Sequence, residues 1–424
     1  MSAHETFVPC EIRDLALAES GKRQIEWAFQ AMPVLGSVRK QFIKTQAFNG
    51  IRVAACLPVT AEAANLIITL RDGGAALAVC GVDARSVQDD VAASLVKDYA
   101  VPVYATHGSG EETDTSWCER VLDPLPDLLL DQAGTLTGSL AHNAQASKPA
   151  IGATVQTREG ARKLRALARE GLLGFPVLSG SSSLTRRVFH SRVGGGQSTL
   201  DVLVAALNIM LAGLNVVVVG YGGMGRGVAS RAKGLGAAVI VTEVDPVRAL
   251  EALLEGYRVL SMAEAAALGD VFVTVSGSRN VIGREHFDKL RNGAILLNGG
   301  HSDVEIDLQT LGQIAGSRRR VRPQVEEVVL RDGRRVHLVA GGRSIHSGWG
   351  DNYPTSVLDL SFANQALSAE YLVKNRESLR AEVYGIPLEI DRQVARLRLE
   401  SAGVKIDRLT VEQEQYLASL SAGD

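Results

Sequence analysis

The stretch VVVVGYGGMGRG, residues 216–227, decides how the second half of this chain folds. Four consecutive valines are typical of a buried parallel strand, and Gly220, Gly222 and Gly225 follow with the spacing G-x-G-x-x-G. In such a turn the first glycine allows the bend, the second lets the backbone approach a pyrophosphate, and the third lets the helix lie close to the strand. We therefore predict a strand, a phosphate-binding turn and a helix, with these three glycines as cofactor-binding residues.

An acidic residue further along supports a dinucleotide ligand. Glu243 ends the next apolar run, about 20 residues after the turn, where a carboxylate accepts hydrogen bonds from the adenosine ribose. The same carboxylate repels the 2′-phosphate of NADP, although Arg248 nearby weakens this preference. We predict NAD as the cofactor and Glu243 as a cofactor-binding residue. A purely structural glycine turn is the alternative.

Both halves of the chain alternate short apolar runs with helical patterns. Continuous apolar strands separated by helices indicate parallel sheets that are covered on both faces. We predict an α/β fold with two doubly wound parallel-sheet domains and a helical C-terminal tail. The expected strands lie at residues 51–57, 76–79, 101–104, 128–130, 216–219, 239–242, 271–275 and 295–297, and the expected helices at 61–70, 87–99, 200–211, 225–233, 247–255 and 361–373. The Ser/Gly-rich residues 179–183 and 194–196 predict a hinge between the domains.

Composition excludes several other classes of protein. A net charge of −2 argues against a nucleic-acid binder, and the first twenty residues lack the apolar core of a signal peptide. The longest apolar stretch, residues 205–220, is interrupted by two asparagines, so we expect no membrane span and a cytoplasmic location. The four cysteines contain no C-x-x-C pair, and we predict no metal site. We expect the only basic cluster, residues 318–322, to form a solvated loop.

Longer segments in both halves resemble the S-adenosylhomocysteine hydrolase family, in its shorter, archaeal-type branch. They are VQDDVAASL (87–95), GGGQST (194–199), GYGGMGRG (220–227), VIVTEVDPVRALEA (239–252), GDVFVTVSG (269–277), NGAILLNGGHSDVEID (292–307), DGRRVHLVAGGR (332–343) and SFANQALSAEYL (361–372). The resemblance implies a homotetramer with tightly held NAD. It also implies an enzyme that transiently oxidises the 3′-hydroxyl of an adenine nucleoside, removes the C4′ proton and releases the 5′ substituent.

The resemblance also implies domain roles and further contacts. Residues 1–190, completed by about 352–390, would bind the substrate, residues 191–351 would bind NAD, and residues 391–424 would form a tail at an oligomer contact. Thr60 and Glu62 match positions that read adenine in some members, and His301 is kept. Thr157, Asn298 and Tyr416 are implied as further NAD contacts.

Several substrate-side motifs depart from the family pattern. An amide replaces a family carboxylate at Gln132 and at Gln156, Arg186 replaces its Lys, and His190 replaces its Asp. The family's Gly-His-Pro becomes Asn352-Tyr353-Pro354, its Gly-Arg-x-x-Asn ends in His346, and its His-Met-Thr becomes Pro58-Val59-Thr60. Arg for Lys is not conservative, because a guanidinium stays protonated where a buried amine can lose its proton.

The clustering of these changes favours a related dehydratase or lyase acting on an adenine nucleoside. His190 would be the base, Arg186 would hold a substrate oxygen, and His301 would protonate the leaving group. Gln132, Gln156, His346 and Tyr353 would complete the substrate site. His190, His346 and His301 could instead be structural histidines. An authentic S-adenosylhomocysteine hydrolase and a non-catalytic NAD-binding regulator remain the alternatives.

Overall fold

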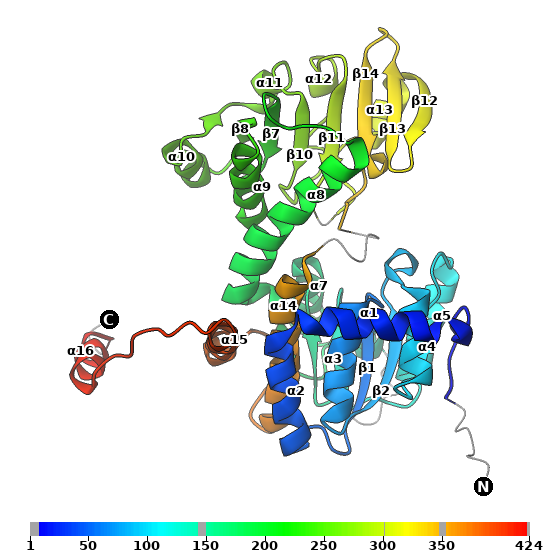
Figure 1. Cartoon of the computed structure of the whole chain (residues 1–424), viewed down its shortest axis with the longest axis vertical. Coiled ribbons are helices and arrows are strands. Elements are labelled where there is room, and N and C mark those ends of the chain that lie inside the picture. Colours follow the sequence, from blue (N-terminus) through cyan, green and yellow to red (C-terminus); the bar gives the residue numbers. More distant parts are fainter. Residues whose placement is uncertain (1–7, 143–149, 301, 347–352, 422–424) are drawn as a thin grey trace.

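The computed structural model describes residues 8–142, 150–300, 302–346 and 353–421, and it contains two α/β bodies, one next to the other (Figure 1). The first sheet has the strand order β15-β6-β5-β4-β1-β2-β3, and its neighbouring strands pair in parallel. The second has the order β12-β13-β14-β11-β10-β7-β8-β9, in which β13 runs antiparallel to its neighbours β12 and β14. The predicted fold class, with two doubly wound sheets and a helical C-terminal region, is confirmed.

The first body combines residues from both ends of the chain. Its strands are β1 (Arg52–Leu57), β2 (Ala76–Gly81), β3 (Val103–Tyr104), β4 (Leu128–Asp131), β5 (Gly152–Val155), β6 (Val177–Ser179) and β15 (Val383–Gly385). Its α-helices are α1 (Ala18–Gln30), α2 (Pro33–Thr45), α3 (Ala61–Asp72), α4 (Asp89–Lys97), α5 (Glu111–Leu122), α6 (Thr135–His142), α7 (Arg158–Arg169), α14 (Thr355–Lys374) and α15 (Leu388–Ser401). Single 3₁₀ turns lie at Leu15–Leu17, Ala84–Ser86 and Gly180–Ser182.

The second body is built from the middle of the chain. Its strands are β7 (Asn215–Val219), β8 (Ala238–Thr242), β9 (Arg258–Val259), β10 (Val271–Thr274), β11 (Ala294–Asn298), β12 (Ala315–Arg322), β13 (Val325–Leu330) and β14 (Arg335–Val339). Its helices are α8 (Gly196–Leu207), α9 (Gly223–Gly234), α10 (Pro246–Leu254), α11 (Met262–Ala265), α12 (Arg284–Phe287), α13 (Leu308–Ile314) and a 3₁₀ turn at Ala340–Gly342. A last helix, α16 (Val411–Ser421), lies apart from both sheets (Figure 1).

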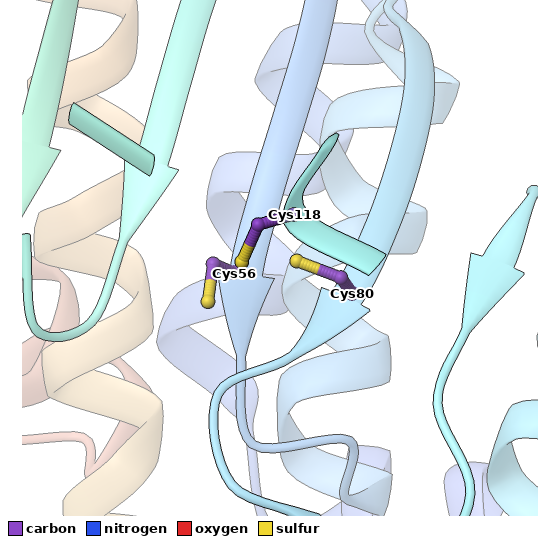
Figure 2. Close-up of side chains that lie close together, drawn as sticks. All are labelled: Cys56, Cys80 and Cys118. Carbon is purple, nitrogen blue, oxygen red and sulfur yellow. The ribbon is translucent and has the colours of Figure 1, made fainter. Parts of the chain in front are cut away.

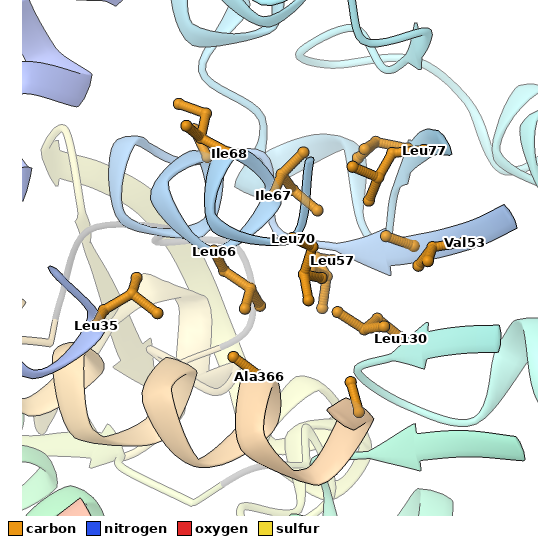
Figure 3. Packing of buried hydrophobic residues seen from close by; sticks show 14 of the residues in the cluster. Leu35, Val53, Leu57, Leu66, Ile67, Ile68, Leu70, Leu77, Leu130 and Ala366 are labelled. Carbon is orange, nitrogen blue, oxygen red and sulfur yellow. The ribbon is translucent and has the colours of Figure 1, made fainter. Parts of the chain in front are cut away.

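Alternate residues of β1 show why the first sheet is covered on both faces. Val53, Ala55 and Leu57 pack with α2, α3 and α14, whereas Ala54 and Cys56 pack on the opposite face with α5 and α7. In Figure 3 side chains of α3 and α14, among them Leu66 and Ala366, point into the layer that faces β1. Successive strand residues point to opposite faces, so a strand buried on both sides must be apolar throughout.

The glycine-rich residues 194–196, part of the predicted hinge, lie in helical structure. Residues Arg186–Gly195 form a π-helix, η4, that continues directly into α8. A Cβ on Gly196 would lie 2.5 Å from the backbone of Gly227, and one on Gly195 would lie 2.2 Å from Met224 Sδ. The glycines therefore let η4 and α8 lie close to α9, which is a packing requirement rather than a need for a flexible loop. Whether the segment bends when ligands bind stays a prediction.

Two further expectations are corrected. The helix expected at residues 200–211 begins earlier and ends at Leu207, because Asn208 adopts the left-handed conformation that ends helices. The basic cluster is not a loop but the edge strand β12, where Arg319 pairs with Glu327 at 2.7 Å across to β13. The sheet edge is thereby charged, which discourages pairing with another strand. No helix in the described part of the chain is long and apolar enough to cross a membrane.

Candidate active site

The predicted substrate-side residues follow neighbouring strands of the first sheet. Thr60 comes shortly after β1, Gln132 directly after β4, Gln156 directly after β5, and Arg186 and His190 lie on η4, which follows β6. The strands β6, β5, β4 and β1 are adjacent and parallel, so their carboxyl ends share one edge. Ligands of open α/β sheets bind at this edge, and the topology therefore gathers residues that are far apart in the sequence.

A guanidinium–amide pair occupies this edge. Arg186 Nη1 donates to Gln156 Oε1 at 2.9 Å, and the Gln156 side chain is buried. A Cβ on Gly180 would lie 2.4 Å from the same Oε1, so the glycine leaves room for the amide. Burial lowers the pKa of Arg186, and neighbouring Arg158 acts in the same direction. Arginine nevertheless stays charged in proteins, so the pair presents a fixed cation beside a neutral amide.

Three rings stack where the chain passes between the two bodies. The His190 and Tyr353 rings are 4.2 Å apart and nearly parallel, at 24°, and the His346 ring is 5.0 Å from that of Tyr353. His190 Nδ1 lies 3.1 Å from Ser361 Oγ on α14, and His346 Nε2 lies 3.4 Å from Thr199 Oγ1 on α8. These contacts hold the three rings against helices of both bodies, so the predicted His190, His346 and Tyr353 form one cluster.

Tyr353 carries a polar atom that the described residues do not satisfy. Its hydroxyl oxygen is buried and has no hydrogen-bond partner within the described ranges. Burial raises the pKa of Tyr353, while the charge of Arg186 acts in the opposite direction. The hydroxyl is therefore protonated at neutral pH and can donate to a bound ligand. An unpaired buried hydroxyl is costly, which makes this atom a candidate substrate contact.

The residues expected to read adenine lie at the start of α3, and one of them is hydrogen-bonded to a residue close to Tyr353 in the sequence. Thr60 caps α3, and its hydroxyl accepts from the Ala63 amide. Glu62 Oε1 accepts from Thr355 Oγ1 at 2.8 Å, two residues after Tyr353. Glu62 Oε2 is buried and finds no partner among the residues that the structure describes. One carboxylate oxygen is thus held in place while the other is able to accept a further hydrogen bond.

Gln132 and Thr157 join the site through the backbone. The Gln132 carbonyl accepts from the amides of Gln156 and Thr157, and Thr157 Oγ1 caps α7 by accepting from Gly160. The neighbouring carboxylate of Asp131 accepts four backbone amides and the Thr137 hydroxyl, so it holds the start of α6. Burial raises the pKa of Asp131, against the effect of these hydrogen bonds.

The second sheet has its own ligand edge, around the glycine turn. Gly220 has a φ of +103°, and Gly222 caps α9 with no side-chain hydrogen bond to its amides. A Cβ on Gly225 would lie 2.0 Å from the Gly220 carbonyl, whereas one on Gly222 would meet nothing within 4 Å. Open space in front of a helix N-terminus is what a pyrophosphate requires. The turn fits a dinucleotide.

Residues on neighbouring strands complete this edge. Glu243 directly follows β8, and its carboxylate accepts from the amides of Tyr221, Val244 and Asp245. Asn298 ends β11 and is fully buried, and its Oδ1 accepts from the Gly300 amide. The strand order reverses between β7 and β10, which is the position where doubly wound sheets bind dinucleotides.

Comparison with known proteins agrees with this geometry. Family models for S-adenosyl-L-homocysteine hydrolase and for its NAD binding domain match residues 9–157 and 192–351. The chain is 46% identical over 414 residues to the adenosylhomocysteinase of Aquifex aeolicus, which covers 97% of this chain and 99% of that protein. It is 44% identical to those of a Nostoc species, over 100% of both chains, and of Sulfolobus acidocaldarius, over 97% and 99%.

The chain belongs to the S-adenosyl-L-homocysteine hydrolase family. Similarity at this level over nearly full length confirms the resemblance predicted from the motifs, and the archaeal relative agrees with the predicted branch. NAD is the cofactor, as predicted, because the NAD-binding family model spans the glycine turn, Glu243 and Asn298. The domain limits at 190, 351 and 390 stay predictions.

The positions predicted to depart from the family pattern are grouped in space. Gln156, Arg186, His190, His346 and Tyr353 contact one another in a chain of hydrogen-bonded, stacked or electrostatic neighbours. A change at one of these positions therefore alters the surroundings of the next.

His301 lies outside the described residues, and Tyr416 is not brought to either edge. Tyr416 is 64% exposed on α16, and residues 401–417 are exposed throughout. Within one chain the structure therefore does not place Tyr416 near the glycine turn.

The structure adds partners that sequence reasoning missed. Ser361, Thr199 and Thr355 hold His190, His346 and Glu62 respectively. Ser361 and Thr199 lie within the motifs SFANQALSAEYL and GGGQST, so their segments carried a signal but their roles did not. Thr355 follows Pro354, where the chain re-enters the first body, and only the fold shows that it meets Glu62.

Proposed function

We propose that this chain is an NAD-dependent adenosylhomocysteinase that hydrolyses S-adenosylhomocysteine to adenosine and homocysteine. The near full-length identity to curated adenosylhomocysteinases supports hydrolysis better than the nucleoside dehydratase favoured by the sequence motifs alone. The structural observation that carries the proposal is the buried ring of His190, stacked on Tyr353 at the ligand edge of the first sheet. In this proposal a small adenine nucleoside is the substrate and binds at this edge.

Bound NAD supplies reversible oxidation of a sugar hydroxyl, which acidifies the adjacent C–H bond. Gly220, Gly222, Gly225, Glu243 and Asn298 would hold it at the edge of the second sheet. Thr157 and Tyr416 are proposed as further contacts, Tyr416 from another subunit because its own helix lies apart from both sheets (Figure 1). This assignment accompanies a proposed homotetramer in which residues 391–424 form a subunit contact.

Arg186 and Tyr353 would bind the sugar oxygens. The guanidinium donates from a fixed position beside Gln156, and the Tyr353 hydroxyl is protonated and buried. Preorganised donors of this kind stabilise the negative charge that develops on an oxygen in the transition state. Gln132 and Gln156 would supply neutral hydrogen bonds around the same sugar.

His190 would remove the C4′ proton. Its ring is buried, stacked on Tyr353 and held at Nδ1 by Ser361, so its orientation is defined. Imidazole is suited to this step because its ordinary pKa lies near neutral pH. His346 would support the ring stack, His301 would serve the leaving group, and Thr60 with Glu62 would read the adenine.

Elimination without re-addition of water is the second candidate. The Gln156–Arg186 pair favours it, because an amide and a permanent cation replace the carboxylate and amine of the family pattern. Such an enzyme would release an unsaturated nucleoside and would be a nucleoside lyase or dehydratase.

A heavy-water experiment separates the two candidates. The NAD-loaded protein is incubated in D₂O with S-adenosylhomocysteine, adenosine and related adenine nucleosides, and the products are analysed by mass spectrometry. Adenosine that carries deuterium at C4′, formed together with homocysteine, supports the hydrolase. An unsaturated nucleoside that has lost its 5′ substituent supports the second candidate. Absence of both product and exchange with every nucleoside would overturn both candidates.

A pair of substitutions sharpens the result. The double variant Gln156→Glu, Arg186→Lys restores the family pattern at the two hydrogen-bonded positions. Under the second candidate it should raise adenosine formation relative to the unsaturated product. Under the hydrolase proposal it should not change the product. The exposed neighbour Arg187→Lys is the matched control.

A further inference from the structure

Three of the four cysteines meet on one face of the first sheet. Cys56 and Cys80 are register partners on the adjacent strands β1 and β2, and Cys118 comes from α5, which covers them. Figure 2 shows the three thiols together, and their sulfur atoms lie within 4.8 Å of one another. The cluster lies outside the hydrogen-bonded and stacked groups of the candidate active site.

The cluster is buried but borders a cavity. Cys56 and Cys80 are at most 1% exposed and Cys118 is 8% exposed, within an apolar core that includes Trp117 and Leu129. A cavity of about 620 Å³ is lined by Cys56 and Cys118, together with Gly81, Glu119 and Ser139. The thiols are thus shielded by apolar side chains on one side and accessible to a small ion on the other.

Cysteine sulfur is the soft ligand that thiophilic cations prefer, and three such sulfurs lie close enough here to contact one ion.

We propose that Cys56, Cys80 and Cys118 form a binding site for a soft, thiophilic metal ion of the Zn²⁺ class. Tetrahedral Zn²⁺ with bonds of about 2.3 Å places its sulfur ligands about 3.8 Å apart, so the thiols need to approach by about 1 Å at most. The sulfurs bind the ion as thiolates, so metal binding releases the thiol protons. A water molecule from the cavity would occupy the fourth ligand position of the ion.

The linear sequence hides this site. The three residues are separated by tens of positions, and C-x-x-C spacing is absent, so motif searching predicts no metal site. Parallel pairing of β1 with β2 and the packing of α5 bring them together. The Cys56 carbonyl also accepts from the Gln132 amide at 3.0 Å, so the metal site adjoins the substrate edge while its ligands are separate from it.

Cobalt(II) is the probe for this site, because thiolate ligation gives it a charge-transfer absorption. The reduced, metal-free full chain is titrated with Co²⁺, and then with Zn²⁺ to displace it. We expect one ion per chain, an absorption typical of several thiolates, and release of protons into weak buffer as the ion binds. Absence of that absorption in the fully reduced protein would overturn the proposal.

Matched variants assign the ligands. Cys118→Ser and Cys80→Ala should each weaken metal binding by at least about 100-fold, the upper end of what loss of a supporting group costs. Cys10→Ser removes the remaining cysteine, which lies outside the cluster, and should leave binding unchanged. Circular dichroism verifies that each variant is folded. Equal binding by Cys118→Ser and the unmodified chain would contradict the assignment, as would a mass showing a disulfide in place of bound metal.

Discussion

The two sheets follow the same winding but build their ligand edges from different parts of the chain. Ordered from β3 and from β9, each sheet runs through its first three strands in reverse and then through the next two in sequence, after which the first sheet continues in sequence and the second ends with β14, β13 and β12. The edge of the second sheet consists mainly of backbone, with Gly220, Gly222 and Gly225 clearing space. The edge of the first consists of side chains that follow the ends of four strands, together with side chains of α14. A backbone site tolerates few residue types, whereas a side-chain site can be altered on an unchanged framework.

The largest expected effect comes from filling the backbone-built edge. Gly225→Val places side-chain atoms where even a Cβ would lie 2.0 Å from the Gly220 carbonyl, so α9 must move away from the turn. We expect loss of NAD binding, measured as cofactor content after purification and by calorimetric titration. Gly234→Ala, on the same helix with nothing within 4 Å, is the control. Retained NAD in the Val variant would show that the turn does not hold the cofactor.

Removing the charge from the side-chain-built edge should act on turnover alone. Arg186→Met removes the donor to Gln156 and the proposed cation at the sugar, and we expect activity to fall by about 100- to 1000-fold. NAD content should be unchanged, because Arg186 lies on the first-sheet side. The control is Arg187→Met, an exposed residue of the same helix. If NAD content fell in parallel with activity, the proposed separation between the two edges would be wrong.

A buried carboxylate on α14 should make the first body's stability depend on pH. Asp359 accepts from the amides of Val34 and Leu35 at the start of α2, and burial raises the pKa of Asp359 to about 6. Because the folded pKa lies above the unfolded one, this contribution is present below about pH 4 and is lost as the pH rises through about 6.

We expect the contribution of Asp359 to the free energy of unfolding to fall by about 2 kcal/mol between about pH 4.5 and about pH 7.5. Urea unfolding of Asp359→Asn and of the unmodified chain at both pH values measures this fall, as the change with pH of the difference between their free energies of unfolding. The exposed Asp288→Asn should show no such change. A pH-independent difference for Asp359→Asn would mean that the carboxylate is not protonated in the folded chain.

The smallest expected effect tests the unpaired hydroxyl. Tyr353→Phe keeps the ring between His190 and His346 and removes only the buried oxygen. We expect kcat/KM to fall by about 10-fold, the value of one hydrogen bond, with no loss of stability. Unchanged kcat/KM together with a raised Tm would show that the hydroxyl is merely unsatisfied and does not touch the substrate.

The accuracy of sequence-based prediction follows the same division. The strands β7, β8, β10 and β11 match the predicted ranges to within about one residue, because their apolar runs and the glycine turn are local signals, whereas the two-residue strand β9 is not predicted. The π-helix η4 is not predicted, since Gly194, Gly195 and Gly196 indicate a hinge until α9 is seen packed against them. The edge strand β12 was expected as a loop because its arginines conceal strand character that pairing with β13 supplies. The two N-terminal helices, α1 and α2, were not anticipated.

The sequence by itself determined the fold class, the NAD turn and the family, because each depends on residues close together in the chain whose spacing is set by backbone geometry. It also pointed to Arg186, His190, His346 and Tyr353 individually. Only the tertiary structure decided that these side chains share one cluster and that Cys56, Cys80 and Cys118 form another. Parallel sheets place distant strand ends side by side, and that proximity is produced by long-range pairing rather than by any local pattern.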